Sequence, residues 1–277
     1  MTAAGLDLNQ AFRISQEFEQ HLLTEKVHRI EKKDLFQHIK KTIEKQFDTY
    51  TSELYELASR LDQLKRPVII YIGGAPGTGK SMLATSLATR LGINKVISTD
   101  SIREIMRLAF SNDLLPTLFH STTEAWKGLP MEFQSSEQLI AGYCLQANQV
   151  SLGVRAVVER TVEEGENLIV EGVHLVPFLH EIAKKEMVDA YHIPITLSIM
   201  NEKHHRERFS ERGTKNLRKI ENFYLERFDG IRSIHEYTLT QCETDDVEVF
   251  DNEDLDETLN LIIQFSIQRL FKQVNSE

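Results

Sequence analysis

Gly74-Ala-Pro-Gly-Thr-Gly-Lys-Ser81 follows the apolar run Val68-Ile-Ile-Tyr-Ile72 in this chain of 277 residues. The stretch fits G-x-x-x-x-G-K-[ST], the pattern of a loop whose backbone N–H groups cradle phosphates. Lys80 supplies a positive charge for the β- and γ-phosphates, and the Ser81 hydroxyl is suited to ligate Mg²⁺. The apolar run predicts a strand, and Lys80–Leu91 predicts a helix whose positive dipole end meets the phosphates. The pattern therefore predicts a nucleotide-binding site.

Composition and charge narrow the class of protein. The chain is 41% hydrophobic and 27% charged, as in soluble globular proteins, and its net charge of −10 argues against a nucleic-acid partner. No apolar run reaches the length of a membrane span, and no secretory signal precedes the first helix. Cys144 and Cys242 lie too far apart in the sequence to indicate a disulfide framework or metal site. These features favour a cytoplasmic protein with no membrane partner.

The spacing of apolar residues along the sequence changes near Pro67. Residues 1–62 carry apolar positions at three- and four-residue spacing, which predicts helices. Beyond Pro67, apolar runs alternate with helical segments, which is typical of a parallel sheet with crossover helices. We expect an α/β fold with three layers, a five-stranded, mostly parallel sheet and a helical lid, preceded by a small all-α region. The predicted strands are 68–72, 95–99, 167–171, 191–200 and 247–250, and the predicted domains are 1–62 and 63–277.

Charged residues follow the second and third predicted strands, where α/β sheets place their functional groups. Asp100 is either a helix cap or a carboxylate that accepts the proton of a phosphoryl acceptor. Arg103, one helical turn later, either binds an anion of that acceptor or lies on the surface. Glu171 ends the third strand, and we expect it to hold Mg²⁺ together with Ser81, usually through water, or to orient the attacking group instead. His174 is either a substrate contact or a packed loop histidine.

Two further segments carry candidate residues. Between the second and third strands, His120, Ser121, Thr122 and Glu124 are candidate acceptor contacts. A helix is predicted over 139–149, and its Gln146 either reaches the acceptor or lies on a solvated helix face. Residues 203–219 contain seven Lys or Arg against two Glu, which suits a small anionic substrate, although a solvated helix face is the alternative. Arg208 and Arg212 share a helix face there, and we expect this lid, at about 201–232, to close them over the phosphates.

Several stretches together resemble the 2-phosphoglycerate kinase family of P-loop kinases. The matching pieces are Ile72-Gly-Gly-Ala-Pro-Gly-Thr-Gly-Lys-Ser81, Ile97-Ser-Thr-Asp-Ser-Ile-Arg-Glu-Ile-Met-Arg107, His120-Ser-Thr-Thr-Glu-Ala-Trp126, Ile169-Val-Glu-Gly-Val-His-Leu-Val-Pro177 and His205-Arg-Glu-Arg-Phe-Ser-Glu-Arg212. The resemblance implies phosphorylation of 2-phosphoglycerate by ATP and Mg²⁺, giving 2,3-bisphosphoglycerate.

The resemblance also indicates which residues do this work. It implies Lys80, Asp100, Arg208 and Arg212 as catalytic residues, and Asp100, Arg103, His120, Ser121, Glu124 and His174 around the acceptor. The residues expected to bind nucleotide are Gly74, Ala75, Pro76, Gly77, Thr78, Gly79, Lys80, Ser81, Met82 and, after the last strand, Asn252.

The N-terminal helices are similar to the helical half of an ATP-cone, a regulatory module. The basic, glycine-containing hairpin of such a module does not precede them here. We therefore expect this segment to serve a structural or oligomerising role, with homo-oligomers formed through its helices.

Two other functions stay open from the sequence. The same fold could act on another acceptor, such as a polyol, an inositol phosphate or a nucleoside phosphate. A nucleotide-dependent regulatory ATPase is the third hypothesis, although such a switch needs no acceptor pocket.

Overall fold

The computed structural model describes residues 1, 4–6, 8–26, 29–130, 135–178, 188–210, 218–245 and 247–276. The chain divides into two compact units. Lys65–Thr258 forms one of them, here called the sheet unit. Met1–Leu64 and Leu259–Glu277 together form the other, here called the helical unit.

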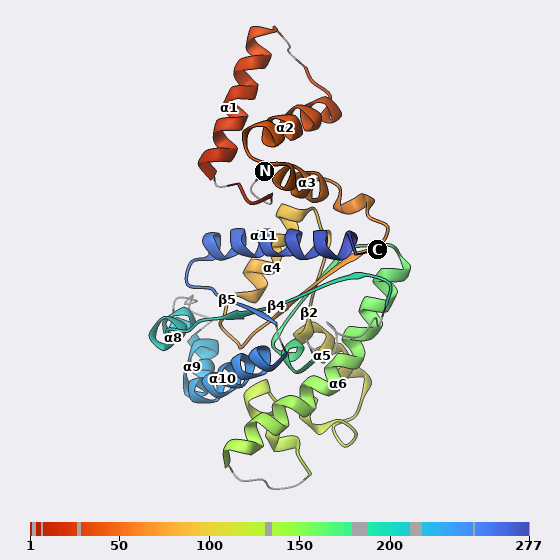
Figure 1. Ribbon diagram of the computed structural model, residues 1–277. Helices are drawn as coiled ribbons and strands as arrows, with labels where there is room; N and C mark the ends of the chain where they lie inside the picture. The colour runs from red at the N-terminus through yellow and green to blue at the C-terminus, as the bar shows by residue number, and fades with distance from the viewer. Residues whose placement is uncertain are drawn as a thin grey trace. The chain divides into compact units, whose positions relative to one another are not determined.

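The sheet unit is built on five parallel strands (Figure 1). They are β1 (Val68–Gly73), β2 (Lys95–Ser98), β3 (Leu168–Glu171), β4 (Tyr191–Ser198) and β5 (Glu248–Asp251). Their order across the sheet is β2-β3-β1-β4-β5, and each neighbouring pair is parallel. The five predicted strands are therefore confirmed. Because β1 lies at the centre, the loop that follows it opens at the middle of the carboxyl edge.

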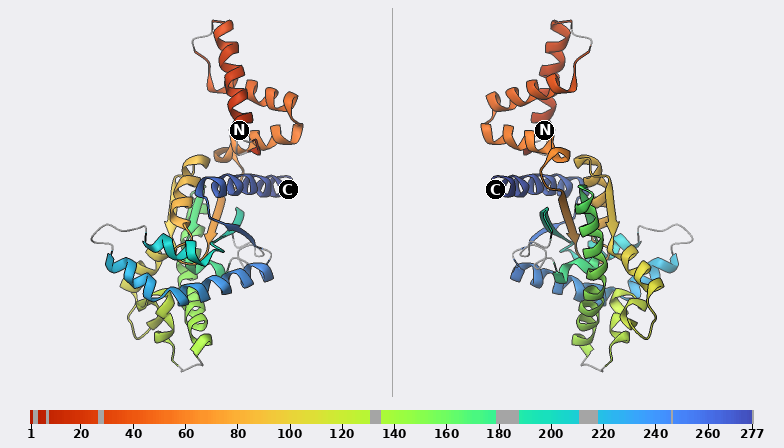
Figure 2. Two further views of the ribbon diagram at one scale, coloured as in Figure 1. Left: turned by 90° about the vertical axis from the view of Figure 1, so that its left-hand side faces the viewer. Right: turned by 90° about the vertical axis from the view of Figure 1, so that its right-hand side faces the viewer.

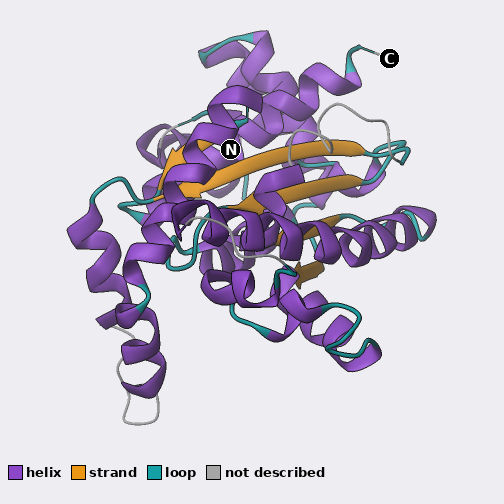
Figure 3. Cartoon of the chain, turned by 90° about the horizontal axis from the view of Figure 1, so that it is seen from below, coloured by secondary structure: helices purple, strands orange, loops and turns teal. Residues whose placement is uncertain are grey.

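Helices cover both faces of this sheet (Figure 3). The α-helices of the sheet unit are α4 (Lys80–Leu91), α5 (Thr99–Ala109), α6 (Ser135–Glu163), α8 (Glu202–Ser210), α9 (Arg218–Glu226) and α10 (Phe228–Asp245). Short 3₁₀ helices are η3 (Pro116–Phe119), η4 (Thr122–Gly128) and η5 (Val173–Phe178). The last helix, α11 (Leu255–Val274), begins in the sheet unit and continues in the helical unit. The predicted three-layer α/β class is confirmed.

Side chains alternate between the two faces of the central strands. Ile69 of β1 and Leu168 of β3 lie opposite each other and pack in one core cluster with Val150 and Val154 of α6. Each of these side chains is buried, and burying an apolar side chain of this size stabilises the fold by about 2 kcal/mol. Helix α4 contacts β1, β2 and β3, and its Leu83 is buried as well. This packing fixes the strand ends that carry the polar residues.

Helix α6 is longer than the sequence analysis expects. The predicted helix over 139–149 extends over Ser135–Glu163, because Val154 and Val158 continue the buried face beyond Val150. Its C-terminal half packs against the sheet, while its N-terminal half lies beside η4 (Figure 2). The helix thus joins the sheet core to the segment that carries the predicted acceptor contacts.

The helical unit contains α1 (Leu8–Thr24), α2 (Lys32–Gln46) and α3 (Thr49–Ala58), followed by the 3₁₀ turn η2 (Leu61–Gln63). Leu6, Ile14 and Ile43 form its buried core. The same unit includes Leu259–Glu277, which the sequence analysis assigned to the kinase domain, so the domain boundaries stay a prediction. Oligomerisation through these helices also stays a prediction. Among the residues that the structure describes, no helix has the length and apolar character of a membrane span.

Gly142 allows the backbone of η4 to approach α6 closely. A Cβ at position 142 would lie 2.2 Å from the Trp126 nitrogen and 2.4 Å from its Cα. Helix propensity alone predicts that Gly142→Ala stabilises the helix by about 1 kcal/mol. We expect the opposite, a loss of about 2 kcal/mol, because backbone atoms of η4 must move.

Urea unfolding measures this loss, with Asn148→Ala at an exposed site of the same helix as the control. A stabilised Gly142→Ala protein would show that the close approach between α6 and η4 does not exist.

Candidate active site

A cavity of about 540 Å³ opens at the carboxyl edge of the sheet. It collects residues from the loop after β1, the end of β2, the start of α5, the start of η4, the end of β3 with the residues that follow it, and helices α8, α9 and α10. The residues that line it are Pro76, Gly77, Gly79, Lys80, Ser81, Met82, Ser98, Asp100, Arg103, Ser121, Thr122, Thr123, Glu171, Gly172, Val173, Phe209, Phe223, Tyr224 and Ile231. Predicted nucleotide, metal and acceptor residues therefore share one cavity.

The carbonyl groups of the phosphate-binding loop have specific partners. Lys80 Nζ donates to the Ala75 carbonyl at 2.7 Å, and Asn252 Nδ2 donates to the Thr78 carbonyl at 2.8 Å. His205 Nε2 lies 2.8 Å from the Pro76 carbonyl. A loop that turns its N–H groups toward phosphate leaves its carbonyls facing the protein, where they need donors. These three side chains supply donors, and the Thr78 hydroxyl adds another to the Ala75 carbonyl at 3.0 Å.

The protonation state of His205 follows from its surroundings. Burial lowers the pKa of His205 to about 4, so the ring is neutral at pH 7. Arg232 Nη1 lies 3.3 Å from Nδ1 and can only donate, which makes Nδ1 the acceptor. The proton of the neutral ring is therefore on Nε2, from which it is donated to the Pro76 carbonyl. The sequence analysis gave His205 no role, although it lies one helical turn before Arg208.

Glycine at position 79 is required by backbone conformation and by space. Its φ is +89°, in the left-handed region, and a Cβ there would lie 2.5 Å from Asn252 Nδ2. Asn252 is fully buried and does not line the cavity, so the structure places it against the loop rather than at an open base site. Its predicted contact with the nucleotide stays a prediction.

Ser81 and Glu171 form a polar pair at the base of the cavity. Ser81 Oγ donates to Glu171 Oε1 at 3.0 Å. Burial raises the pKa of Glu171, while the nearby charge of Lys80 and the bond from Ser81 oppose that rise. A hydroxyl and a carboxylate beside a phosphate-binding loop are the oxygen ligands that Mg²⁺ takes alongside water and phosphate. The donor set therefore fits Mg²⁺.

Asp100 and Arg103 lie on the wall formed by α5. The cap of this helix is Ser98, whose Oγ accepts from the Ser101 N–H at 3.1 Å, so the alternative of Asp100 as the cap is wrong. Asp100 is exposed to the cavity instead. Arg103 donates through Nη1 to the His120 carbonyl at 3.1 Å and through Nη2 to Glu104 at 3.2 Å. Its Nε is buried, with no protein partner among the described residues.

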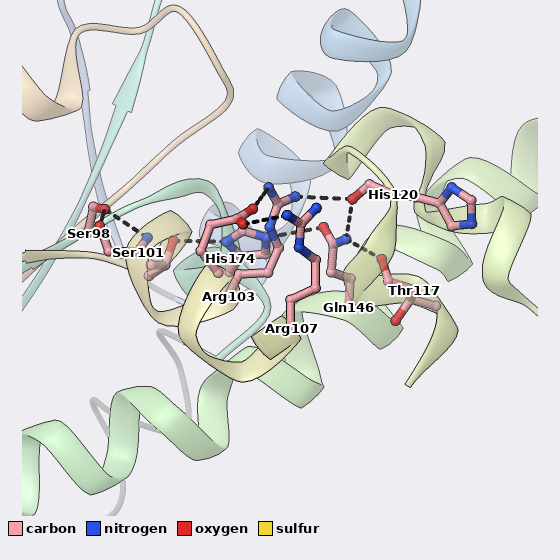
Figure 4. A network of polar contacts seen from close by, with 10 residues as sticks. Ser98, Ser101, Arg103, Arg107, Thr117, His120, Gln146 and His174 are labelled. Atoms are coloured by element: carbon pink, nitrogen blue, oxygen red, sulfur yellow. Dashed lines mark hydrogen bonds and ion pairs between the residues drawn. The ribbon is translucent and has the colours of Figure 1, made fainter. Parts of the chain in front are cut away.

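His174 and Gln146 lie behind this wall (Figure 4). His174 is 1% exposed, it does not line the cavity, and burial lowers its pKa to about 4. Of the two readings of this residue, the packed histidine describes its position, because both ring nitrogens contact protein groups. Gln146 is fully buried, so neither alternative for it holds: it reaches no acceptor cavity and lies on no solvated face.

Glu124 and His120 also fall outside the cavity lining, whereas Ser121 and Thr122 line it. Both carboxylate oxygens of Glu124 are engaged: Oε1 accepts from Lys127 at 2.6 Å and from Arg227 at 3.2 Å, and Oε2 accepts from Ser121 at 3.1 Å. The structure thus places Glu124 in an ion-pair cluster that holds η4 against Arg227, and not against an acceptor.

The lid arginines are placed only in part. Arg208 Nη2 donates to the carbonyls of Asn252 and Glu253, the latter at 3.1 Å, and Arg208 does not line the cavity. Its Nη1 would lie 3.3 Å from a Cβ on Gly79, so the guanidinium is beside the phosphate-binding loop. Arg212 lies outside the described residues. The catalytic roles of both arginines stay predictions.

The sequence analysis missed the aromatic wall of the cavity. Phe209, Phe223 and Tyr224 line it, and the rings of Phe209 and Tyr224 stack with centroids 5.0 Å apart. Arg206, one residue beyond His205, places its guanidinium 4.3 Å from the centre of the Phe228 ring. The repeat of His205 and Phe209 on one helix face was the signal that could have indicated this packing.

A parallel sheet with a phosphate-binding loop after its central strand, a lid helix and an acceptor wall defines a P-loop kinase. The AAA domain family model matches residues 70–229. The 2-phosphoglycerate kinase of Methanopyrus kandleri is 36% identical over 98% of this chain and 82% of that protein. The 2-phosphoglycerate kinase of Methanocaldococcus jannaschii is 36% identical over the whole chain and 88% of that protein. The chain therefore belongs to the 2-phosphoglycerate kinase family, with an AAA domain at 70–229, and is a phosphotransferase.

A solved structure of a gluconokinase from Sinorhizobium meliloti 1021 is similar in part. It is 13% identical, the match covers 76% of this chain and 98% of that one, and the TM-score is 0.43.

Replacing Asn252 by Asp tests the support of the loop. The substitution Asn252→Asp turns the donor to the Thr78 carbonyl into an acceptor, so two oxygens face each other in a buried place. We expect the affinity for ATP to fall at least about tenfold, because an unsatisfied buried group costs about 1–3 kcal/mol.

Isothermal titration calorimetry measures this affinity. The matched control is Asn201→Asp, since the Asn201 side chain acts only through its oxygen, which accepts from Lys203 and His204 N–H groups. Equal ATP affinity in Asn252→Asp and wild type would contradict the assigned role.

The Glu124 cluster predicts a pH-dependent contribution to stability. The hydrogen bond from Lys127, followed by those from Arg227 and Ser121, lowers the pKa of Glu124 to about 2 from its ordinary value of 4.5. A carboxyl whose pKa is lowered by folding stabilises the native state above its unfolded pKa, and this contribution is lost as the pH falls through the folded pKa. The stability lost in Glu124→Gln should therefore be largest near pH 7 and should shrink below about pH 5.

Thermal unfolding of both proteins from about pH 3 to pH 8 gives this difference. Glu207→Gln, at an exposed and loose pair with Lys203, serves as the control and should show a difference near zero. A difference for Glu124→Gln that does not change with pH would argue against the ion-pair cluster.

Proposed function

We propose that this phosphotransferase moves the γ-phosphoryl group of ATP to 2-phosphoglycerate and forms 2,3-bisphosphoglycerate. The proposal is supported by one observation above all. Lys80 and Ser81 of the phosphate-binding loop line the same cavity as Asp100 and Arg103, so a donor phosphate and an anionic acceptor have room side by side. The names of the archaeal relatives support the choice of acceptor.

On the nucleotide side, the loop amides and Lys80 would bind the β- and γ-phosphates. Ser81 and Glu171 would hold Mg²⁺, which supplies a positive charge between the phosphates when it is bound. The Glu171 carboxylate would contact the ion either directly or through a bound water. Arg208 and Arg212 of the lid would neutralise further charge as the phosphoryl group transfers.

On the acceptor side, 2-phosphoglycerate offers a hydroxyl at C3, a phosphate at C2 and a carboxylate. The C3 oxygen would attack the γ-phosphorus while the bond to the β-γ bridging oxygen breaks and ADP leaves. Asp100 would take the proton of the hydroxyl, and Arg103 would bind one of the acceptor's anions. Thr122 would add a hydroxyl donor from the cavity lining. Ser121 lines the cavity beside it, with its own hydroxyl proton donated to Glu124.

The proposed function also bears on the binding partners of the protein and on its cellular compartment. We propose this small anionic metabolite and the nucleotide as ligands, and further copies of the chain, joined through the N-terminal helices, as partners. Both cysteines, Cys144 and Cys242, are free thiols, which suits a reducing compartment such as the cytoplasm.

An acceptor screen tests the proposed function. ADP release is followed with 2-phosphoglycerate, other phosphorylated acids, polyols, inositol phosphates and nucleotides, and the product is identified by ³¹P NMR. We expect stimulation by 2-phosphoglycerate and formation of 2,3-bisphosphoglycerate. Stimulation by another acceptor would show that the proposed substrate is wrong. Slow ATP hydrolysis that no acceptor stimulates would support a regulatory ATPase.

Two substitutions test the roles in this reaction. Lys80→Ala should abolish turnover, because the charge on the transferred phosphoryl group loses its buried partner. Asp100→Asn should lower kcat by about 10²- to 10⁴-fold, the usual contribution of a positioned base. Asp113→Asn, at an exposed carboxylate away from the cavity, is the control for a change of charge alone. A kcat near that of wild type in Asp100→Asn would remove Asp100 from the mechanism.

A further inference from the structure

A buried polar network lies directly behind the acceptor wall (Figure 4). Gln146 of α6 is its centre: Nε2 donates to the Thr117 carbonyl at 2.6 Å and to the His120 carbonyl at 3.0 Å. Its Oε1 lies 3.1 Å from His174 Nε2. Thr99 Oγ1 lies 2.9 Å from His174 Nδ1. Thr99, Thr117, Gln146 and His174 are all buried, and none of them lines the cavity.

The direction of each bond in the network is determined. Both protons of the Gln146 amide go to carbonyls, so its oxygen must accept, and His174 Nε2 must carry the proton. His174 Nδ1 then accepts from the Thr99 hydroxyl. The hydrogen bonds therefore all point in one direction: Thr99 donates to His174, His174 donates to Gln146, and Gln146 donates to the carbonyls of Thr117 and His120.

The two ends of the network adjoin the residues assigned to the acceptor. Thr99 directly precedes Asp100. The His120 carbonyl also accepts from Arg103 Nη1 at 3.1 Å, and His120 directly precedes Ser121 of the cavity wall. Gln146 and Arg103 thus share one acceptor atom. Without the Gln146 amide, the Arg103 guanidinium is the one side-chain donor left to that carbonyl among the described residues, and the guanidinium and the carbonyl can shift together.

We propose that Gln146 is a positioning residue, which sets the place of the Arg103 guanidinium through the His120 carbonyl, with His174 orienting its amide. The proposal rests on the proposed function in so far as Arg103 binds the acceptor. A buried network whose polar groups are all hydrogen-bonded fixes the positions of its members. An apolar side chain of similar size would fill the same space without fixing the position of the His120 carbonyl. The network therefore acts on acceptor binding and leaves the nucleotide side unchanged.

The substitution Gln146→Met tests this role, because Met fills a similar volume and makes none of the three bonds. We expect KM for 2-phosphoglycerate to rise about tenfold, with kcat within about twofold and KM for ATP unchanged, since only the guanidinium that binds the acceptor is released. A purely structural role would lower kcat in proportion to the folded fraction and leave both KM values unchanged. That result would overturn the proposal.

The control is Thr161→Val, at a buried hydroxyl of the same helix that donates only to the Val157 carbonyl, at 2.8 Å. It should change neither KM value. If Gln146→Met does not fold, the nearly isosteric Thr99→Val breaks the other end of the network. A rise in acceptor KM at unchanged kcat in Thr99→Val supports the proposal, and an unchanged acceptor KM overturns it.

A crystal structure of Gln146→Met separates this proposal from the proposed function. If 2-phosphoglycerate does not stimulate the wild-type enzyme, the proposed acceptor is wrong, and the position of Arg103 still gives a result. An Arg103 guanidinium displaced from its wild-type place supports the positioning role. A guanidinium that stays within about 3.5 Å of an unmoved His120 carbonyl overturns it.

Discussion

The phosphate-binding loop can point its N–H groups at phosphate only if its carbonyl groups, which face the protein, find hydrogen-bond donors there. A tight loop that aims amides at an anion turns the opposite side of each peptide toward the protein, and a buried carbonyl without a donor costs about 1–3 kcal/mol. Here the donors come from three places: Lys80 within the loop, His205 on the lid helix α8, and Asn252 after β5. The geometry of the loop therefore depends on elements distant in the sequence.

This requirement links the lid to the nucleotide side. His205 contacts the Pro76 carbonyl, and Arg208 of the same helix donates to the carbonyl of Asn252, which in turn supports Thr78. Helix α8 is consequently attached to the loop through two residues that lie one helical turn apart. The acceptor side is supported separately, by the network of Gln146 and by the Glu124 cluster. The two halves of the cavity are thus held by different contacts, and this separation allows nucleotide and acceptor binding to be perturbed independently.

Much of the fold could be predicted, because its signals are local. The five strands follow from short apolar runs, and the loop between β1 and α4 follows from a motif of eight residues. Asp100 and Arg103 were placed at the cavity because parallel strands bring their carboxyl ends to one edge. The cap at Ser98 was missed, since both Ser98 and Asp100 are good capping residues and the sequence does not decide between them.

The supporting contacts could not be predicted, because their partners are far apart in the chain. His205 and Pro76 are separated by 129 positions, Glu124 and Arg227 by 103, and Gln146 and His174 by 28. A glutamine or histidine in a helical pattern looks the same whether it faces solvent, a substrate or another buried polar group. Only tertiary packing decides among these, which is why Glu124, His174 and Gln146 were assigned to the acceptor or left open.

A crystal structure with 2-phosphoglycerate and a non-hydrolysable ATP analogue tests the central claim most directly. The account predicts the terminal phosphate on the loop at Lys80, the C3 hydroxyl of the acceptor within hydrogen-bonding distance of Asp100, and an acceptor anion on Arg103. An acceptor bound away from Asp100 and Arg103, with the analogue in the loop, would contradict it.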